Sequence, residues 1–123
     1  MDRTLAHIFI LLTVLFGFYG QMVLKWQVNL AGPLPATWPE RATYVLRLLL
    51  NPWVMSSLAG AFLGMVTWMM ALTKAELSYA YPFTSLSFVL ILVASALLFD
   101  EAVTPAKLVG LGLIVAGIIV SSR

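Results

Sequence analysis

The sequence predicts an all-α membrane protein with four transmembrane helices and both termini on one side of the membrane. Its 123 residues are 62% apolar and only 10% charged, whereas soluble domains carry about 25% charged residues. The mean hydropathy is +1.00. Four apolar stretches, each about long enough to cross a hydrocarbon core of about 30 Å, occupy most of the chain. We therefore expect one transmembrane domain over residues 1–123.

The first half of the chain holds two of these helices. The first, at about residues 5–28, is too long for the apolar core of a cleavable signal peptide, so we expect it to be retained. Asn29 to Glu40 contains a glycine and three prolines and predicts a loop. Residues 41–50 are amphipathic and predict a short interfacial helix. Asn51-Pro52 then predicts the start of the second transmembrane helix, at about 52–72.

The second half holds the remaining two helices. A short polar link follows the second helix, and the third is expected at about residues 77–99. Thr104 followed by Pro105 is typical of an N-cap with proline at the first helical position, so the fourth helix is expected at about 105–120. An even number of crossings places both termini on the same side.

The composition excludes several classes of function. The chain has no Cys and a single His, which excludes disulfides, thiolate metal sites and multi-histidine clusters, so we predict no metal and no other cofactor. The formal net charge of +2 comes from scattered residues, without a basic run typical of nucleic-acid binding. We therefore predict that the protein is not an enzyme and has no nucleic-acid partner.

The distribution of Lys and Arg leaves the orientation in the membrane open. Cytoplasmic loops normally carry an excess of these residues. Here the side with both termini has three, and the other side has four: Arg3, Lys74 and Arg123 against Lys25, Arg41, Arg47 and Lys107. Either the chain inserts both ways and pairs antiparallel, or a partner subunit fixes its orientation.

Polar residues on the first helix define a candidate binding face. At helical spacings of three and four, one arc collects Thr13, Gly17, Gly20, Gln21 and Lys25. In lipid such an arc faces protein or water. Lys25, one turn beyond Gln21, either grips an anionic group together with that amide or simply extends its ammonium to the interface.

The second helix combines a packing seam with a candidate aromatic contact. Ser56, Gly60 and Gly64 recur every four residues, which favours close helix packing. Trp68 lies further along that face, where it either stacks on a substrate or belongs to an interfacial aromatic belt.

The third helix contains the most unusual stretch, around Pro82. Proline removes a backbone N–H and clashes with the preceding turn, so a kink is expected. The hydroxyls of Ser78, Tyr81 and Ser85 either satisfy the freed carbonyl or bind sugar and phosphate oxygens. Carboxylates near the helix ends, Glu76 and Glu101, act either as solvated or capping charges or in proton coupling.

The fourth helix is almost free of polar atoms. Its glycines, Gly110 and Gly117 among them, favour a contact with another helix. Four helices leave little room to enclose a polar pathway, so a dimer of eight helices is expected.

Three patches of this sequence resemble the small four-helix members of the drug/metabolite transporter superfamily, across essentially the whole chain. The likeness is specific to the subunits of the flippase for aminoarabinose-phosphoundecaprenol. The patches are Gly20-Gln21 with Lys25, residues 77–82 with Ser85 and Phe88, and Glu101 with Thr104-Pro105 leading into residues 110–117. The last patch also resembles the dimerisation helix of the small multidrug resistance exporters.

One departure separates the chain from those exporters. They place a glutamate in the first helix that binds both cationic drug and proton, and the matching position here is Gly17. A site of Gln21, Lys25 and hydroxyls attracts an anion instead.

The resemblance implies a flippase that moves a polyprenyl-monophosphate-linked sugar across the bacterial inner membrane. Lys25 would neutralise the phosphate, and hydrogen bonds would come from Gln21, Ser78, Tyr81 and Ser85. It also implies a homodimer, or a heterodimer with a homologous subunit. Two alternatives stay open: a cation/proton exporter using Glu76 or Glu101, and a non-transporting partner of a flippase subunit or glycosyltransferase.

Overall fold

The computed structural model describes residues 3–123 and is all-helical; Met1 and Asp2, which belong to the predicted domain, lie outside the described residues. Its elements are α1 (Arg3–Ala31), α2 (Glu40–Leu50), α3 (Pro52–Leu72), α4 (Leu77–Ala80), the 3-10 helix η1 (Tyr81–Ser85), α5 (Leu86–Leu98) and α6 (Pro105–Ser121). Three segments are long and apolar enough to cross a membrane, namely α1, α3 and the continuous stretch Leu77–Leu98. A shorter apolar helix of 17 residues, α6, follows them.

Local capping chemistry sets two helix starts. Asn51 Oδ1 accepts a hydrogen bond from the Trp53 backbone N–H at 2.8 Å, and Pro52 occupies the first turn of α3. Thr104 Oγ1 accepts one from the Lys107 N–H at 3.2 Å, with Pro105 in the first turn of α6. Both starts expected from the sequence are confirmed, because a side-chain oxygen before a proline satisfies a helix N-terminus without distant contacts.

The end of α1 lies further along the chain than expected. The sequence predicted a loop from Asn29, whereas α1 continues to Ala31. The first residue that requires a break is Gly32, whose φ of 84° lies in the left-handed region that glycine adopts without strain. No proline or glycine precedes it within the last turn, so the helix continues to that point.

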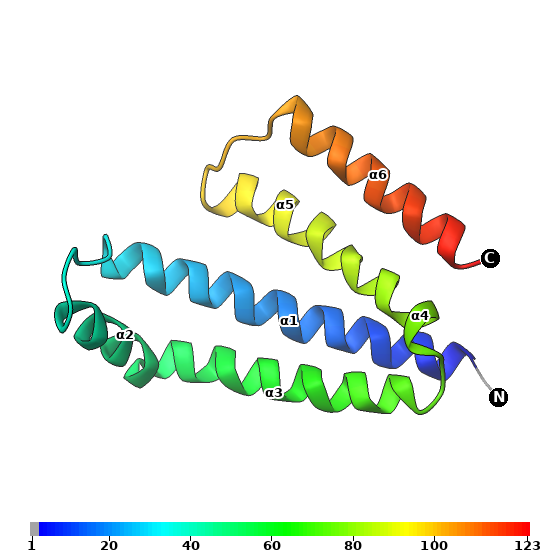
Figure 1. The fold of residues 1–123 in the computed structure, drawn as a ribbon, viewed down its shortest axis with the longest axis horizontal. Helices are drawn as coiled ribbons and strands as arrows, with labels where there is room; N and C mark the ends of the chain where they lie inside the picture. Colours follow the sequence, from blue (N-terminus) through cyan, green and yellow to red (C-terminus); the bar gives the residue numbers. More distant parts are fainter. Residues whose placement is uncertain (1–2) are drawn as a thin grey trace.

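The core lies between α1 and α3, which run side by side along most of their length (Figure 1). Small residues lie where the two helices meet: a Cβ at Gly60 would lie 3.3 Å from the Tyr19 Cδ2, which is tighter than usual, whereas one at Gly64 would make an ordinary contact of 3.5 Å with the Phe16 Cβ. Ser56 contributes a hydrogen bond of 2.8 Å to the Tyr19 hydroxyl. The predicted packing role of Ser56, Gly60 and Gly64 is therefore confirmed, and their partner is α1.

A 3-10 segment interrupts the third predicted helix at Pro82. The Thr84 hydroxyl donates to the Tyr81 carbonyl at 2.6 Å, and the Ser87 hydroxyl donates to the Thr84 carbonyl at 2.7 Å. The sequence had offered Ser78, Tyr81 and Ser85 either for the carbonyl that Pro82 frees or for a ligand, and the bonds from Thr84 and Ser87, which reach the carbonyls of residues 81 and 84, leave that choice open. A hydroxyl reaches the carbonyl three or four residues before it, which Thr84 and Ser87 do here.

The last helix, α6, is the least attached. It lies at the outer edge of the fold beside α5, away from α1 and α3 (Figure 1), and it meets the rest of the described chain mainly at η1. None of its residues is buried within residues 3–123. A Cβ at Gly110 or Gly117 would meet no atom of the described chain within 4 Å. One whole helix is thus left for other contacts.

Candidate functional site

A small polar groove runs between α1 and the η1 and α5 segments, and we call it the α1–α5 groove. Its cavity of about 180 Å³ is lined by Thr13, Val14, Gly17, Gln21, Thr84, Ser87 and Ile91. Small-molecule sites usually enclose about 300 to 1,000 Å³. The groove of a single chain is therefore smaller than a typical small-molecule site.

Most polar groups in this groove already have partners. The Thr13 and Thr67 hydroxyls lie 2.7 Å apart, which ties α1 to α3, while those of Thr84 and Ser87 bond to carbonyls within their own segment. The Gln21 amide has no hydrogen-bond partner among the described residues. Gln21 is thus the group in the groove that is most available to a ligand.

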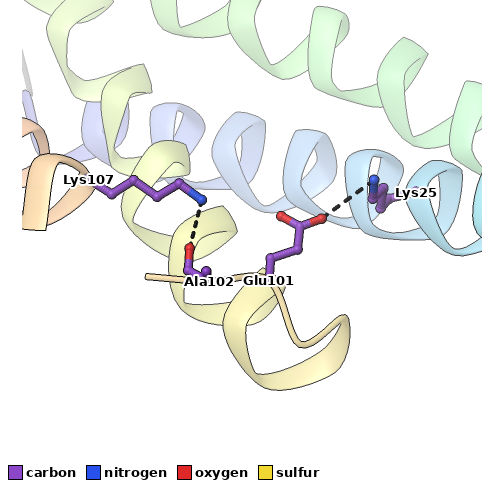
Figure 2. A network of polar contacts seen from close by, with 4 residues as sticks. All are labelled: Lys25, Glu101, Ala102 and Lys107. Carbon is purple, nitrogen blue, oxygen red and sulfur yellow. Dashed lines mark hydrogen bonds and ion pairs between the residues drawn. The ribbon is translucent and has the colours of Figure 1, made fainter. Parts of the chain in front are cut away.

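An ion pair lies one helical turn beyond Gln21. Lys25 Nζ is 3.5 Å from Glu101 Oε2, and the two side chains are 47% and 39% exposed (Figure 2). Close to it, Lys107 Nζ donates to the Ala102 carbonyl at 2.8 Å. The Lys25 ammonium therefore has a carboxylate partner, whereas the Lys107 ammonium bonds to a backbone carbonyl.

The turn after α5 brings Glu101 back to α1. Asp100 adopts a φ of 53°, a left-handed conformation that Asp tolerates better than most residues. The Glu101 N–H then donates to the Ser95 carbonyl at 3.3 Å. This reversal ends α5 and places the carboxylate beside Lys25, 76 positions earlier in the chain.

The other predicted site residues gather at the opposite end of the bundle. Trp68 packs against the buried cluster of Ile10, Ala71 and Ala80, and its ring meets the exposed Tyr81 ring edge-on, with centroids 6.0 Å apart. Ser78 is exposed, and Ser85 is half-buried at the end of η1.

These predicted residues do not form one pocket. Ile10, which marks the level of Trp68, precedes Lys25 by fifteen residues, which corresponds to about 22 Å along an α-helix. The structure brings Lys25 and Gln21 together at one end, and Trp68 with Tyr81 at the other. Glu76 lies at the start of α4 without a side-chain capping bond, whereas Glu101 belongs to the Lys25 end.

Sequence reasoning missed three polar residues near these sites. Thr84 and Ser87 line the groove. Arg3 lies with its guanidinium carbon 4.2 Å from the centroid of the Tyr79 ring, and that tyrosine hydroxyl is 3.0 Å from His7 Nε2. The hydroxyls were visible in the sequence beside Pro82, but their direction depends on the 3-10 geometry.

Comparison with known proteins identifies the family. The chain matches the EamA-like transporter family over residues 3–123, nearly its whole length. The chain belongs to that family. With three membrane-length helices as well, this EamA-like transporter is a multi-pass inner-membrane protein.

Its relatives carry a more specific name. The EamA-like transporter is 34% identical to a probable 4-amino-4-deoxy-L-arabinose-phosphoundecaprenol flippase subunit ArnE of Aeromonas hydrophila over 108 residues, which cover 88% of this chain and 89% of the relative. A protein of the same name in Aeromonas salmonicida is 32% identical, and the match covers 95% of this chain and 93% of the relative. Another in Pseudomonas aeruginosa UCBPP-PA14 is 40% identical, and the match covers 61% of this chain and 65% of the relative. No solved structure matches the chain.

Proposed function

We propose that this chain is one subunit of a flippase that moves a polyprenyl-monophosphate-linked sugar, such as aminoarabinose-phosphoundecaprenol, across the inner membrane without making or breaking covalent bonds. It does so as a domain of four transmembrane helices, α6 being the fourth, with both termini on one side. The α1–α5 groove, with Lys25 at its end, carries this proposal. The names of the ArnE relatives support the substrate class.

The headgroup travels along the groove while the polyprenyl tail stays in lipid. At one end, the Lys25 ammonium exchanges Glu101 for the phosphate, and the free Gln21 amide donates a hydrogen bond to it. At the other end, the Trp68 and Tyr81 rings contact the sugar, with hydroxyls from Ser78 and Ser85. A path with polar groups at both ends and hydroxyls between them suits a ligand that must cross from one leaflet to the other.

A second subunit completes the pathway. The groove of one chain is too small to enclose a sugar phosphate, and α6 leaves Gly110 and Gly117 open to a neighbouring helix. The curated relatives are named as flippase subunits. The partner is a second copy of this chain or a homologous subunit.

The geometry does not favour cation and proton export. An exporter of lipophilic cations needs a carboxylate inside the membrane, and α1 contains no Asp or Glu. Glu101 is paired with Lys25, and Glu76 is exposed at the N-cap position before α4.

The test measures transport in inner-membrane vesicles from cells that make the amino-sugar lipid. In these cells this chain replaces the native subunit that it resembles. An impermeant amine reagent measures how fast the amino sugar reaches the outer leaflet. A charged hydrogen bond contributes about 1.5–3 kcal/mol, so Lys25→Gln should slow transport about 10- to 150-fold.

The variant Glu101→Gln separates a phosphate ligand from a structural ion pair. It frees Lys25, so transport should stay within about threefold of wild type or rise, since an exposed pair contributes only about 0–1 kcal/mol to stability. Lys74→Gln, at the opposite end of α3, is the matched control. Wild-type transport by Lys25→Gln, or equal losses in both variants of the pair, would contradict the phosphate role.

A further inference from the structure

A larger cavity lies on the other side of α1, and we call it the α2 cavity. Its volume is about 560 Å³, within the usual range for small-molecule sites, and its walls come from the end of α1, the following loop and α2. Gln27 of α1 lines it. Because Gln27 is two residues beyond Lys25, or about 200° around the helix, the cavity faces away from the Lys25–Glu101 pair. Figure 1 shows α2 on the α3 side of α1 and the α5–α6 connection on the other side.

Two features indicate that the cavity belongs to the headgroup region of the membrane. The Trp26 and Trp53 rings meet with centroids 5.2 Å apart at this end of the α1 and α3 pair, and tryptophans are typical of membrane interfaces. The α2 helix is amphipathic and has no buried residue among those described. A ligand in this cavity therefore reaches it from the membrane surface.

Hydrogen bonds fix the polar floor of the cavity and leave one donor free. Asn51 Oδ1 accepts from the Trp53 N–H, so its amide nitrogen is the atom that donates to Gln27 Oε1 at 3.0 Å. Gln27 is only 6% exposed, and its own amide nitrogen has no partner within residues 3–123. Among the described residues no fully buried side-chain nitrogen or oxygen is unpaired, so this nitrogen is accessible. Its N–H groups remain available to an acceptor.

Two opposite charges stand on the cavity face of α2. Glu40 and Arg47 both line the cavity, seven residues or about 10 Å apart along the helix, too far to pair directly. Neither side chain has an ion-pair or hydrogen-bond partner in the part of the chain that the structure describes. Tyr44, between them, is already engaged by donating to the Gly32 carbonyl at 2.7 Å.

We propose that the α2 cavity binds a zwitterionic lipid headgroup, with its ammonium at Glu40 and its phosphate at Arg47 and the Gln27 amide. An anion alone would leave Glu40 unpaired, and a cation alone would leave Arg47 unpaired, whereas a headgroup with both charges pairs each of them. The inference rests on the proposed function, because an amino sugar joined to a phosphate has this chemistry. Phosphatidylethanolamine shares it, so the two sources need separate measurements.

The experiment is native mass spectrometry of the full-length protein in maltoside detergent. The probes are the amino-sugar phosphopolyprenol, its analogue with a hydroxyl in place of the amine, phosphatidylethanolamine and phosphatidylglycerol. We expect Arg47→Gln to weaken binding of both glycolipids about tenfold, and Glu40→Gln to weaken only the amine-bearing one, down to the level of its hydroxyl analogue. Arg123→Gln, with its guanidinium at the opposite end of the bundle, should leave all affinities unchanged.

The outcomes decide both the chemistry and the source. Equal binding of the amine and hydroxyl glycolipids by wild type, or unchanged amine selectivity in Glu40→Gln, would overturn the proposal. Phosphatidylethanolamine binding that depends on Glu40 and Arg47 as strongly as glycolipid binding supports the zwitterionic site and makes bulk lipid a source. If Lys25→Gln transports at the wild-type rate while glycolipid binding still depends on Glu40 and Arg47, only the proposed transport mechanism is refuted. If Lys25→Gln loses transport but glycolipid binding does not depend on Glu40 and Arg47, only the proposal for the α2 cavity is refuted.

Discussion

Replacing single glycines by alanine measures how closely α1 and α3 approach. A Cβ at Gly20 would lie 3.2 Å from the Ser57 backbone oxygen, which is closer than an ordinary contact and cannot be relieved by rotating a side chain. At Gly64 the new Cβ would lie 3.5 Å from the Phe16 Cβ and 3.7 Å from the Thr13 oxygen, which are ordinary contacts. Gly20→Ala must therefore move one helix, whereas Gly64→Ala need not.

The difference between the two variants isolates the cost of that movement. Both gain the helix propensity of alanine over glycine, about 1 kcal/mol, so this term cancels when they are compared. Overpacking usually costs about 1–3 kcal/mol. We expect the free energy of unfolding of Gly64→Ala to equal that of wild type or exceed it by up to about 1 kcal/mol. That of Gly20→Ala should be about 1–3 kcal/mol lower than that of Gly64→Ala.

The assay is a titration of mixed micelles with sodium dodecyl sulfate, followed by tryptophan fluorescence. Two of the four tryptophans, Trp26 and Trp53, come from α1 and α3, so in a chain with Trp38→Phe and Trp68→Phe the emission reports on the separation of these two helices. Circular dichroism in parallel checks that helix content is unchanged. If Gly20→Ala and Gly64→Ala unfold at the same detergent fraction, the contact with Ser57 yields without cost and the reasoning is refuted.

Two further predictions concern assembly and orientation. Gly117→Leu should convert a dimer to a monomer in detergent, measured by light scattering, whereas Gly112→Leu on another face of α6 should not; unchanged assembly in both would place the interface elsewhere. For orientation, cysteines are introduced at Thr73, on the side of both termini, and at Thr37, on the other side, and labelled on intact cells with an impermeant thiol reagent. Two lysines added after Ser122 should keep the side of both termini in the cytoplasm, because cytoplasmic loops favour basic residues, so labelling should shift from position 73 to position 37. Labelling of one position alone in the parent chain would exclude insertion in both orientations.

Helix starts were predictable because they depend on neighbouring residues. Asn51 and Thr104 each accept a backbone N–H within three positions, and proline follows both. The seam at Gly60 and Gly64 was predictable for a related reason, since helices in lipid pack through small residues. The sequence did not reveal that α1 would be the partner, because that choice depends on the packing of the whole chain.

The directions of the hydroxyls near Pro82 were not predictable from an ideal helix. A 3-10 helix turns about 120° per residue and an α-helix about 100°, so five residues of η1 rotate everything beyond them by about 100°. Thr84 lies within η1 and Ser87 just beyond it, and both line the groove, where the sequence had favoured Ser78, Tyr81 and Ser85. The pairing of Lys25 with Glu101 depends in the same way on the left-handed Asp100 turn.

The unequal lengths of the helices make this protein sensitive to bilayer thickness. The 29 residues of α1 extend about 44 Å, whereas the 17 residues of α6 extend about 26 Å, a few ångströms less than a hydrocarbon core of about 30 Å. Hydrophobic mismatch of this kind is relieved by tilting the long helix, thinning the bilayer around the short one, or covering the short one with another helix. Lipids with long acyl chains thus favour association through α6, and lipids with short chains weaken that preference. Acyl-chain length therefore has to be held constant whenever two preparations of this protein are compared.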